Sequence, residues 1–310
     1  MSIGFYIFFQ KKCEVLIFSY KSLFCIPMIL TSSDNSKKRI AYNGIEGAFA
    51  SIAARKIFPN DTLVSFQDFR SAYQAVEKGK CDYAVLPIEN SFAGEVSQVS
   101  DLMFHGSLFI TDVYEITVVQ NLLGVKGTTI DSIKSVVSHP HALEQCSEFI
   151  REHGYQVVHA SNTALGAKQV AEQNDITLGA IASIETAKLY NLEVLKENIN
   201  ESDDNSTRFA VFSRYKKDET ERKDDDYFIM MFTVANQSGS LVKALNVIGN
   251  HGFNMTELRS RPQRRLAWEY YFFVEAQGSL LSEEGRTMVG ELSEKCELLK
   301  ILGSYQIKVV

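Results

Sequence analysis

The sequence lacks the features that define several protein classes. Its 310 residues include only five cysteines, five prolines and one tryptophan. The cysteines are odd in number and scattered, and none stands at the C-x-x-C spacing of a zinc or redox motif: Cys13, Cys25, Cys81, Cys146 and Cys296. Neither a disulfide framework nor a metal site is therefore expected, and a reduced, cytoplasmic location fits this usage.

Long apolar runs and an excess of basic charge are also missing. No segment approaches the roughly 20 apolar residues of a membrane span. Apolar segments within residues 1–36 are interrupted by Lys11, Lys12 and Lys21, and their order is wrong for a signal peptide. We predict that residues 1–36 are a disordered or non-native extension. The true start of translation is predicted at Met28, within this segment.

The charge balance restricts the choice of partner. Lys and Arg number 32 against 38 Asp and Glu, a net charge of −6. A nucleic-acid binder would show a basic stripe, so neither a nucleic acid nor a membrane is expected as a partner. An anionic ligand would have to be attracted by a few placed donors, because the overall field is unfavourable.

Alternating strand and helix signals begin at Lys37 and predict an α/β fold. The first unit has strands at 39–42, 62–66 and 83–87 and helices at 48–57, 68–77 and 95–104, followed by a strand region at 108–121. The second has strands at 135–138, 156–159 and 177–180 and helices at 142–152, 164–173 and 184–190. The repeated rhythm predicts two lobes around a ligand cleft, at about 37–112 with 193–215 and at 113–192.

The pattern changes after a charged segment at 216–226, which is typical of a linker. Beyond it we predict strands at 227–234, 255–260, 268–276 and 301–309 and helices at 240–249 and 282–296. This βαββαβ order indicates a ferredoxin-like module over 227–310. A free edge of its sheet would allow dimers to form by strand pairing.

Polar residues stand where loops meet the predicted strands. Thr207, Arg208 and Phe209 enter an apolar strand, with Thr207 and Phe209 on one face and Arg208 on the other. Residues 87–91 follow another strand, a position where open α/β sheets bind ligands. Each feature alone is also typical of an ordinary turn or strand start.

Two histidines invite a metal or catalytic interpretation. His139 and His141 are two residues apart, whereas two ligands from one helix face need a spacing of three or four. We therefore predict helix capping or cleft lining for this pair, and no metal.

Together the motifs resemble the prephenate dehydratase family with a C-terminal ACT regulatory domain. The matching segments are 44–49, 81–91, 138–146, 162–164, 207–209, 239–242 and 259–262. The resemblance implies a catalytic domain at 37–215 with two lobes like a periplasmic binding protein and an active site in the cleft. It implies conversion of prephenate to phenylpyruvate, with loss of carbon dioxide and water, in phenylalanine biosynthesis. No cofactor is expected.

The resemblance also assigns roles to residues. The threonine of Thr-Arg-Phe is tied to catalysis in this family, so Thr207 is predicted to donate a hydrogen bond to the departing hydroxyl, and Glu89 is the nearest candidate proton donor. The predicted substrate-binding residues are Asn90, Ser91, Gln145, Thr163, Arg208 and Phe209. For Arg208, carboxylate binding and a structural role are both left open.

The ACT resemblance implies phenylalanine binding at a subunit interface with feedback inhibition, in a homodimer or homotetramer. The predicted binding residues are Gly239, Ser240, Leu241, Val242, Asn254, Arg259, Ser260, Arg261 and Pro262. The usual Pro-Gly-Ala-Leu here begins with Ser238, and Arg259 stands where the family has glutamate. The strength of feedback is therefore open.

Two alternatives remain at this point. Arogenate dehydratase uses the same chemistry on the amino-acid analogue of prephenate, and no residue decides between the substrates. A non-catalytic amino-acid-binding protein would share the two-lobed architecture, but binding alone does not call for Thr207-Arg-Phe.

Overall fold

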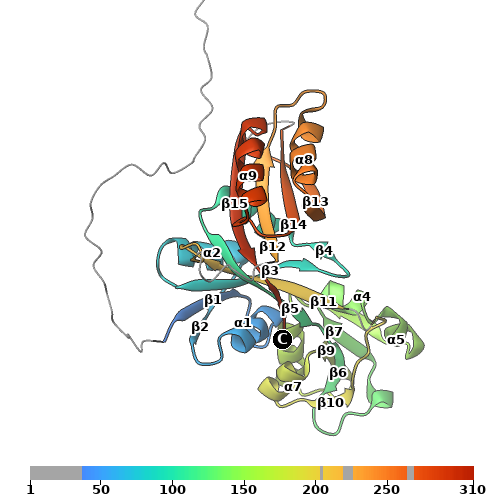
Figure 1. Cartoon of the computed structure of the whole chain (residues 1–310). Helices are drawn as coiled ribbons and strands as arrows, with labels where there is room; N and C mark the ends of the chain where they lie inside the picture. The colour runs from blue at the N-terminus through green and yellow to red at the C-terminus, as the bar shows by residue number, and fades with distance from the viewer. Residues whose placement is uncertain (1–36, 203–204, 219–225, 264–268) are drawn as a thin grey trace, which may run out of the picture. The chain divides into compact units, whose positions relative to one another are not determined.

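The structure is a computed structural model that describes residues 37–202, 205–218, 226–263 and 269–310. The predicted extension at 1–36 and most of the predicted linker lie outside these residues. The chain divides into two compact units (Figure 1). The large unit takes in Asn35–Asp218 with Tyr305–Val310, and the small unit contains Glu219–Ser304. No described helix is long and apolar enough to cross a membrane.

The large unit contains a mixed seven-stranded sheet in the order β16-β5-β11-β3-β1-β2, with β4 paired to β3. Its strands are β1 (Arg39–Asn43), β2 (Thr62–Phe66), β3 (Tyr83–Asn90), β4 (Gly94–Glu95), β5 (Phe109–Thr117), β11 (Ser206–Ser213) and β16 (Ile307–Val309). The helices are α1 (Phe49–Ile57), α2 (Phe69–Glu77) and α3 (Ser97–His105). The Asp68 carboxylate accepts the Ser71 N–H at 2.7 Å and starts α2, as predicted.

A β-bulge in β3 decides which side chains share a face. Thr207 pairs with Asn90, whereas Phe209 pairs with Pro87, so β3 holds one residue more than β11 between these two pairs. Alternation without the bulge would place residues three apart on opposite faces. The bulge therefore brings Pro87 and Asn90 to the face that carries Thr207 and Phe209.

A second, five-stranded sheet in the large unit has the order β10-β6-β9-β7-β8. Its strands are β6 (Asn121–Gly124), β7 (Ser135–Ser138), β8 (Gln156–His159), β9 (Leu178–Ala182) and β10 (Glu193–Lys196). The helices are η1 (Ile130–Ser132), α4 (Pro140–Glu144), α5 (Ser147–Glu152), α6 (Thr163–Gln173) and α7 (Ile184–Tyr190). Gly166 lets α6 pack closely on β7, because a Cβ there would lie 3.0 Å from the Val137 carbonyl oxygen.

Several predicted boundaries differ from the structure. The strand predicted to end at residue 87 continues to Asn90, and the helix predicted at 142–152 is two helices. The strand region at 108–121 divides between the two sheets. β5 extends the first sheet beyond the predicted lobe boundary at 112, and β10 joins the second sheet, although 193–215 was assigned to the first lobe. Apolar alternation marks a strand but does not say which sheet it joins.

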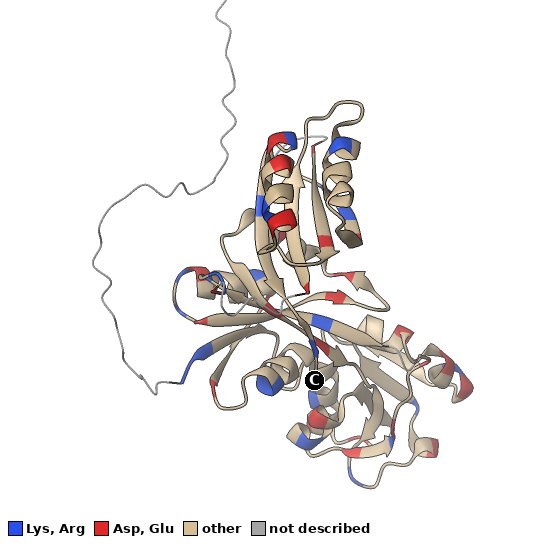
Figure 2. Ribbon diagram, in the orientation of Figure 1, with Lys and Arg blue, Asp and Glu red and all other residues tan. Residues whose placement is uncertain are grey.

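The small unit contains β12 (Tyr227–Thr233), α8 (Ser240–Asn250), β13 (Asn254–Pro262), β14 (Tyr270–Gln277), α9 (Glu283–Lys295) and β15 (Leu298–Tyr305). The sheet order is β13-β14-β12-β15, and the βαββαβ element order agrees with the prediction. Phe228, Met230 and Phe232 of β12 pack with Ile248 of α8 and Leu292 of α9. Helix α9 contains both acidic and basic residues (Figure 2).

The predicted strand at 301–309 is wrong as a single strand of the small sheet. β15 ends at Tyr305, and β16 pairs in parallel with β5 of the large unit. The Lys308 ammonium lies 2.7 Å from the Asp112 carboxylate and holds β16 on that edge. The end of the chain therefore completes the seven-stranded sheet.

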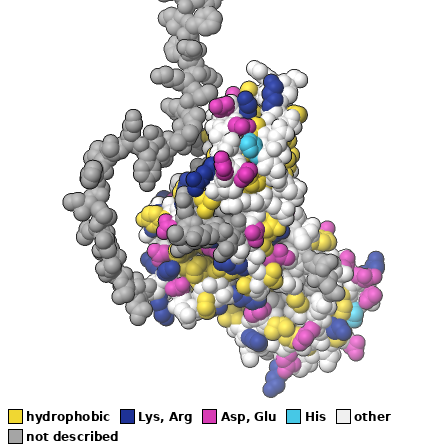
Figure 3. All heavy atoms as spheres, in the orientation of Figure 1, with side chains coloured by type: hydrophobic (Ala, Val, Ile, Leu, Met, Phe, Trp, Pro, Cys, Tyr) yellow, Lys and Arg dark blue, Asp and Glu magenta, His cyan; other side chains and the backbone are white. Residues whose placement is uncertain are grey.

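Charges of the two signs are mixed on the surface. On the face shown in Figure 3, basic side chains are scattered among acidic and apolar ones.

Candidate active site

A cavity of about 610 Å³ lies within the large unit. Its walls come from both sheets and the helices that follow their strands. The polar lining residues include Asn43, Asn90, Gln98, Gln120, His139, His141, Gln145, Asn162, Thr163 and Thr207. Phe49, Phe69, Pro87 and Phe209 supply apolar surface. The size and the mixed lining are typical of a site for a small organic molecule.

The described lining of this cavity includes neither lysine nor arginine. It includes instead the first residues of α1, α3 and α6. Ala48 and Val96, the N-caps of α1 and α3, make no side-chain hydrogen bond to their helices. First-turn N–H groups have no acceptor inside a helix, and the helix dipole favours negative charge there. The N-termini of these helices bring backbone N–H donors to the cavity. Such donors would offset the unfavourable net charge of the protein for an anionic ligand.

His139 and His141 take the roles predicted for them. His139 is the N-cap of α4, where its Nδ1 accepts the His141 N–H at 3.2 Å, and both residues line the cavity. Burial, and then the nearby His141, lower the pKa of His139. Because Nδ1 is an acceptor, the neutral ring carries its proton on Nε2, which is left as a hydrogen-bond donor.

The orientation of the Asn90 carboxamide is fixed by the backbone. Its Oδ1 accepts the N–H groups of Phe92 at 3.1 Å and Ala93 at 2.8 Å. Nδ2 must then be the donor toward Thr207 Oγ1, at 3.0 Å. The Thr207 oxygen is therefore an acceptor in this bond, and its own hydroxyl proton is available for donation to a molecule in the cavity.

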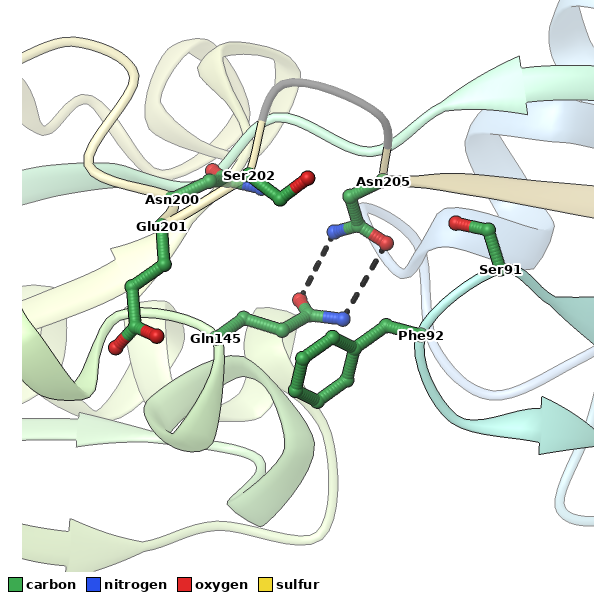
Figure 4. Close-up of a pocket in the computed structure, with 7 residues that line it drawn as sticks. All are labelled: Ser91, Phe92, Gln145, Asn200, Glu201, Ser202 and Asn205. Carbon is green, nitrogen blue, oxygen red and sulfur yellow. Dashed lines mark hydrogen bonds between the residues drawn. The ribbon is translucent and has the colours of Figure 1, made fainter.

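A pair of carboxamides lies behind this contact. The Asn205 amide donates to Gln145 Oε1 at 3.0 Å, and the Gln145 amide donates to Asn205 Oδ1 at 3.3 Å. Figure 4 shows the two side chains facing each other in the lining of a smaller cavity of about 170 Å³. Gln145 lines both cavities, whereas Ser91 lines the smaller one and its hydroxyl accepts the Ser206 N–H.

Arg208 and Glu89 take no part in the described lining of the large cavity. Arg208 NH1 lies 3.5 Å from Glu89 Oε2, and Arg208 Nε lies 3.7 Å from Glu115 Oε2. The sheet register places Glu89, Arg208 and Glu115 side by side on three neighbouring strands. The guanidinium thus lies among protein carboxylates, on the sheet face opposite to Thr207.

Comparison with known proteins agrees with the motifs. The model of the family described as prephenate dehydratase matches residues 40–217. An arogenate dehydratase/prephenate dehydratase of Arabidopsis thaliana is 35% identical over 313 residues, covering 94% of this chain and 79% of the relative. The bifunctional chorismate mutase/prephenate dehydratase of Escherichia coli K12 is 34% identical over 303 residues, covering 96% and 78%.

The chain belongs to the prephenate dehydratase family. The resemblance to the prephenate dehydratase family is confirmed, and so is the interpretation that the protein is an enzyme. Among solved structures, the prephenate dehydratase of Arthrobacter aurescens in complex with L-Phe has a TM-score of 0.80 at 26% identity, covering 86% of this chain and 89% of that one. The quorum-quenching acylase GqqA has a TM-score of 0.80 at 31% identity, covering 87% and 98%.

Residues predicted to bind an effector lie in two places in the small unit. Gly239, with φ of +79°, is the N-cap of α8, followed by Ser240, Leu241 and Val242. The others lie on the edge strand β13, where Arg259 pairs with Glu257 and lies 5.1 Å from the Phe273 ring, and Arg261 Nε donates to the Tyr271 hydroxyl at 3.0 Å. A cavity of about 160 Å³ is lined by Leu241 and by other residues of this unit.

Within the dehydratase site, the structure adds residues that the sequence interpretation omitted. Asn205 was part of the predicted strand start but received no role, and the N-terminus of α3 at Val96 carries no side chain that would mark it as a donor. Five of the predicted site residues line the large cavity: Asn90, Gln145, Thr163, Thr207 and Phe209.

Proposed function

We propose that this enzyme converts prephenate to phenylpyruvate, carbon dioxide and water in phenylalanine biosynthesis. The observation that carries the proposal is the fixed Asn90 amide, which leaves the Thr207 proton for a ligand in the large cavity. The experiment that tests it is an assay of phenylpyruvate formation from prephenate by the full chain. A folded, pure protein that forms no phenylpyruvate from prephenate and no phenylalanine from arogenate would contradict it.

The chemistry asks little of the protein beyond positioning and hydrogen bonding. The bond from the ring to its carboxylate breaks, the electron pair enters the ring, and the bond from the ring to the hydroxyl oxygen breaks. The departing oxygen leaves as hydroxide stabilised by the Thr207 hydrogen bond and takes a proton from water. Aromatisation supplies much of the driving force, so orientation and donation to the leaving oxygen are the main catalytic terms.

Prephenate carries two carboxylates, and this cavity offers neutral donors for them. The candidates are the first-turn N–H groups of α1 and α3, the Asn and Gln amides, and His139 Nε2. Neutral donors suit this reaction because the carboxylate that leaves must lose its charge. A tight lysine or arginine pair would stabilise the ground state and oppose decarboxylation.

Arogenate is the second candidate substrate. It has an ammonium group in place of the keto group of prephenate, and Glu95 lies in the cavity lining. Three of the relatives are named for arogenate dehydratase activity. A carboxylate near the side chain of the substrate attracts an ammonium group and would favour arogenate over prephenate. Parallel measurements of kcat/KM on both compounds decide between them.

We assign Glu89 a structural role instead of the predicted role of proton donor. Glu89→Gln is expected to change kcat by less than about threefold and to leave the pH profile unchanged, because the carboxylate lies against Arg208 on the other face. Initial rates from pH 5 to 9 check this. A Glu89→Gln enzyme with a loss of about 100-fold, the size of a general-acid effect, would restore the earlier role.

We also propose that the small unit is an ACT domain that binds phenylalanine and inhibits the enzyme, and that the two sheets of the large unit form lobes like those of a periplasmic binding protein. The support is the βαββαβ order and the relative in complex with L-Phe. Homodimers or homotetramers would use the edge strand β13. Calorimetry with phenylalanine and light scattering test binding and assembly.

An acylase activity like that named for GqqA is less well supported. Thr207 Oγ1 accepts a hydrogen bond from the Asn90 amide, which does not activate the hydroxyl as a nucleophile. Burial raises the pKa of the neighbouring Cys146 thiol to about 12, so a thiolate is not available near neutral pH. Release of a fatty acid from an acyl-homoserine lactone would be measured to test this alternative.

A further inference from the structure

Two chain segments join the sheets of the large unit, and asparagines tie them together. One segment lies between β5 and β6, and the other lies between β10 and β11. Asn200 Nδ2 donates to the Val118 carbonyl at 2.9 Å, and the Gln120 N–H donates to Asn200 Oδ1 at 2.7 Å. The relative position of the two sheets is therefore set where these crossing segments meet.

Asn205 belongs to the same crossing and is bonded to it twice. Its backbone carbonyl accepts the Val118 N–H at 2.8 Å, and its amide donates to the Val118 carbonyl at 3.2 Å. The side chain is only 4% exposed. A buried carboxamide costs stability unless its donors and acceptors are satisfied, and here both ends of the amide have protein partners.

The other contacts of Asn205 lead into the active site. Its Oδ1 accepts Nδ2 of Asn90 at 3.0 Å and Nε2 of Gln145 at 3.3 Å, and its Nδ2 also donates to Gln145. Asn90 comes from the seven-stranded sheet and Gln145 from the helix after β7 of the other sheet. The Asn205 carboxamide thus contacts Val118 of the crossing, Asn90 and Gln145. Figure 4 shows its contact with Gln145.

We propose that Asn205 is a positioning residue for the dehydratase reaction. It holds the Gln145 carboxamide and the Asn90–Thr207 pair in fixed positions relative to the crossing segments. The inference rests on the proposed function, since it concerns the geometry of that same site. Asn205 itself need not touch substrate, because it acts through Gln145 and Asn90.

The test uses the nearly isosteric substitution Asn205→Asp in the full chain. The new oxygen would face the Val118 carbonyl and Gln145 Oε1, so both donated bonds become repulsive. We expect kcat/KM for prephenate to fall by about 100-fold, the effect of a displacement of roughly 1 Å in a positioned group. The matched control is Asn121→Asp, a buried amide that donates to the Ala182 carbonyl and lines neither described cavity.

A mutant cycle separates positioning from a general loss of stability. Asn205→Ala, Gln145→Ala and the double variant are compared in kcat, KM and Tm. Residues that act as a unit are not additive, so the double variant is expected to be no slower than the worse single variant. Asn121→Asp should lower Tm and leave kcat within about twofold of the wild type.

Three results would overturn the proposal. Asn205→Asp could keep kcat/KM within about twofold of the wild type, or the two alanine effects could multiply in full. Asn121→Asp could also lose as much activity as Asn205→Asp, which would reduce both effects to stability. A wild-type chain that is inactive on both prephenate and arogenate removes the proposed function and this inference with it.

Discussion

Thr207→Ala is expected to lower kcat on prephenate by about 1,000-fold, within the range for loss of an aligned proton or hydrogen-bond donor. In the proposed mechanism the Thr207 hydroxyl donates a hydrogen bond to the departing oxygen, because the Asn90 amide already donates to the Thr207 oxygen. The residue is 8% exposed and lies in a strand paired on both sides, so the fold should persist. KM should change little, since the bond gains strength as negative charge develops on the leaving oxygen.

Two substitutions at the same position separate the hydroxyl from the volume of the side chain. Thr207→Val keeps the shape and should be as slow as Thr207→Ala, whereas Thr207→Ser keeps the hydroxyl and should lose no more than about tenfold. Stopped-time assays of phenylpyruvate, with circular dichroism as the check on folding, provide the measurement. Near-normal turnover by folded Thr207→Val would remove Thr207 from the mechanism.

Asn90→Asp is expected to lower kcat by about 100-fold to 1,000-fold, although it removes no heavy atom. The retained oxygen would still accept from Phe92 and Ala93, and the new oxygen would replace the donor that faces Thr207. Thr207 would then turn its proton toward the aspartate and lose it for the substrate. The substitution reverses the bond to Thr207 and also removes the donor to Asn205 Oδ1 and the Ser206 carbonyl.

The control for this reversal is Asn174→Asp, at the exposed end of α6, where the backbone is left-handed with φ of 50° and aspartate is tolerated. It should keep wild-type kinetics. In a Thr207→Val background, Asn90→Asp should cost little more, because the hydroxyl it would misdirect is already gone. A full additional loss in that background would mean that Asn90 acts on substrate directly.

Local pattern predicted most of the secondary structure and the residues on the catalytic strand. Alternation placed Thr207 and Phe209 on one face and Arg208 on the other, as the cavity lining and the Arg208–Glu89 contact now show. Four predicted elements, at 62–66, 135–138, 156–159 and 184–190, have the observed bounds. The bounds of these elements and the alternation of faces depend on residues that are close in sequence, so a single sequence is enough to predict them.

The remaining features depend on contacts between distant residues. The bulge in β3 that turns Asn90 toward Thr207 depends on register with β11, more than 100 residues later, and no local signal marks it. The donors of α3 are backbone groups, so Val96 reveals nothing as a residue type. Asn205 stood beside the motif, yet its role depends on Gln145 and Val118.

The path of the chain has a consequence for exchanging the small unit between relatives. The last strand, β16, belongs to the catalytic sheet, so the small unit is an insertion within the large one and not a terminal appendage. Cutting the chain between Asp218 and Asp226 would leave the two pieces joined by strand pairing and by the Lys308–Asp112 contact. A chain that ended at Asp218 would lack β16 and expose the edge of β5, a nine-residue strand. An exposed strand edge promotes self-association. A transplanted module must bring, or be followed by, a strand that fits this edge.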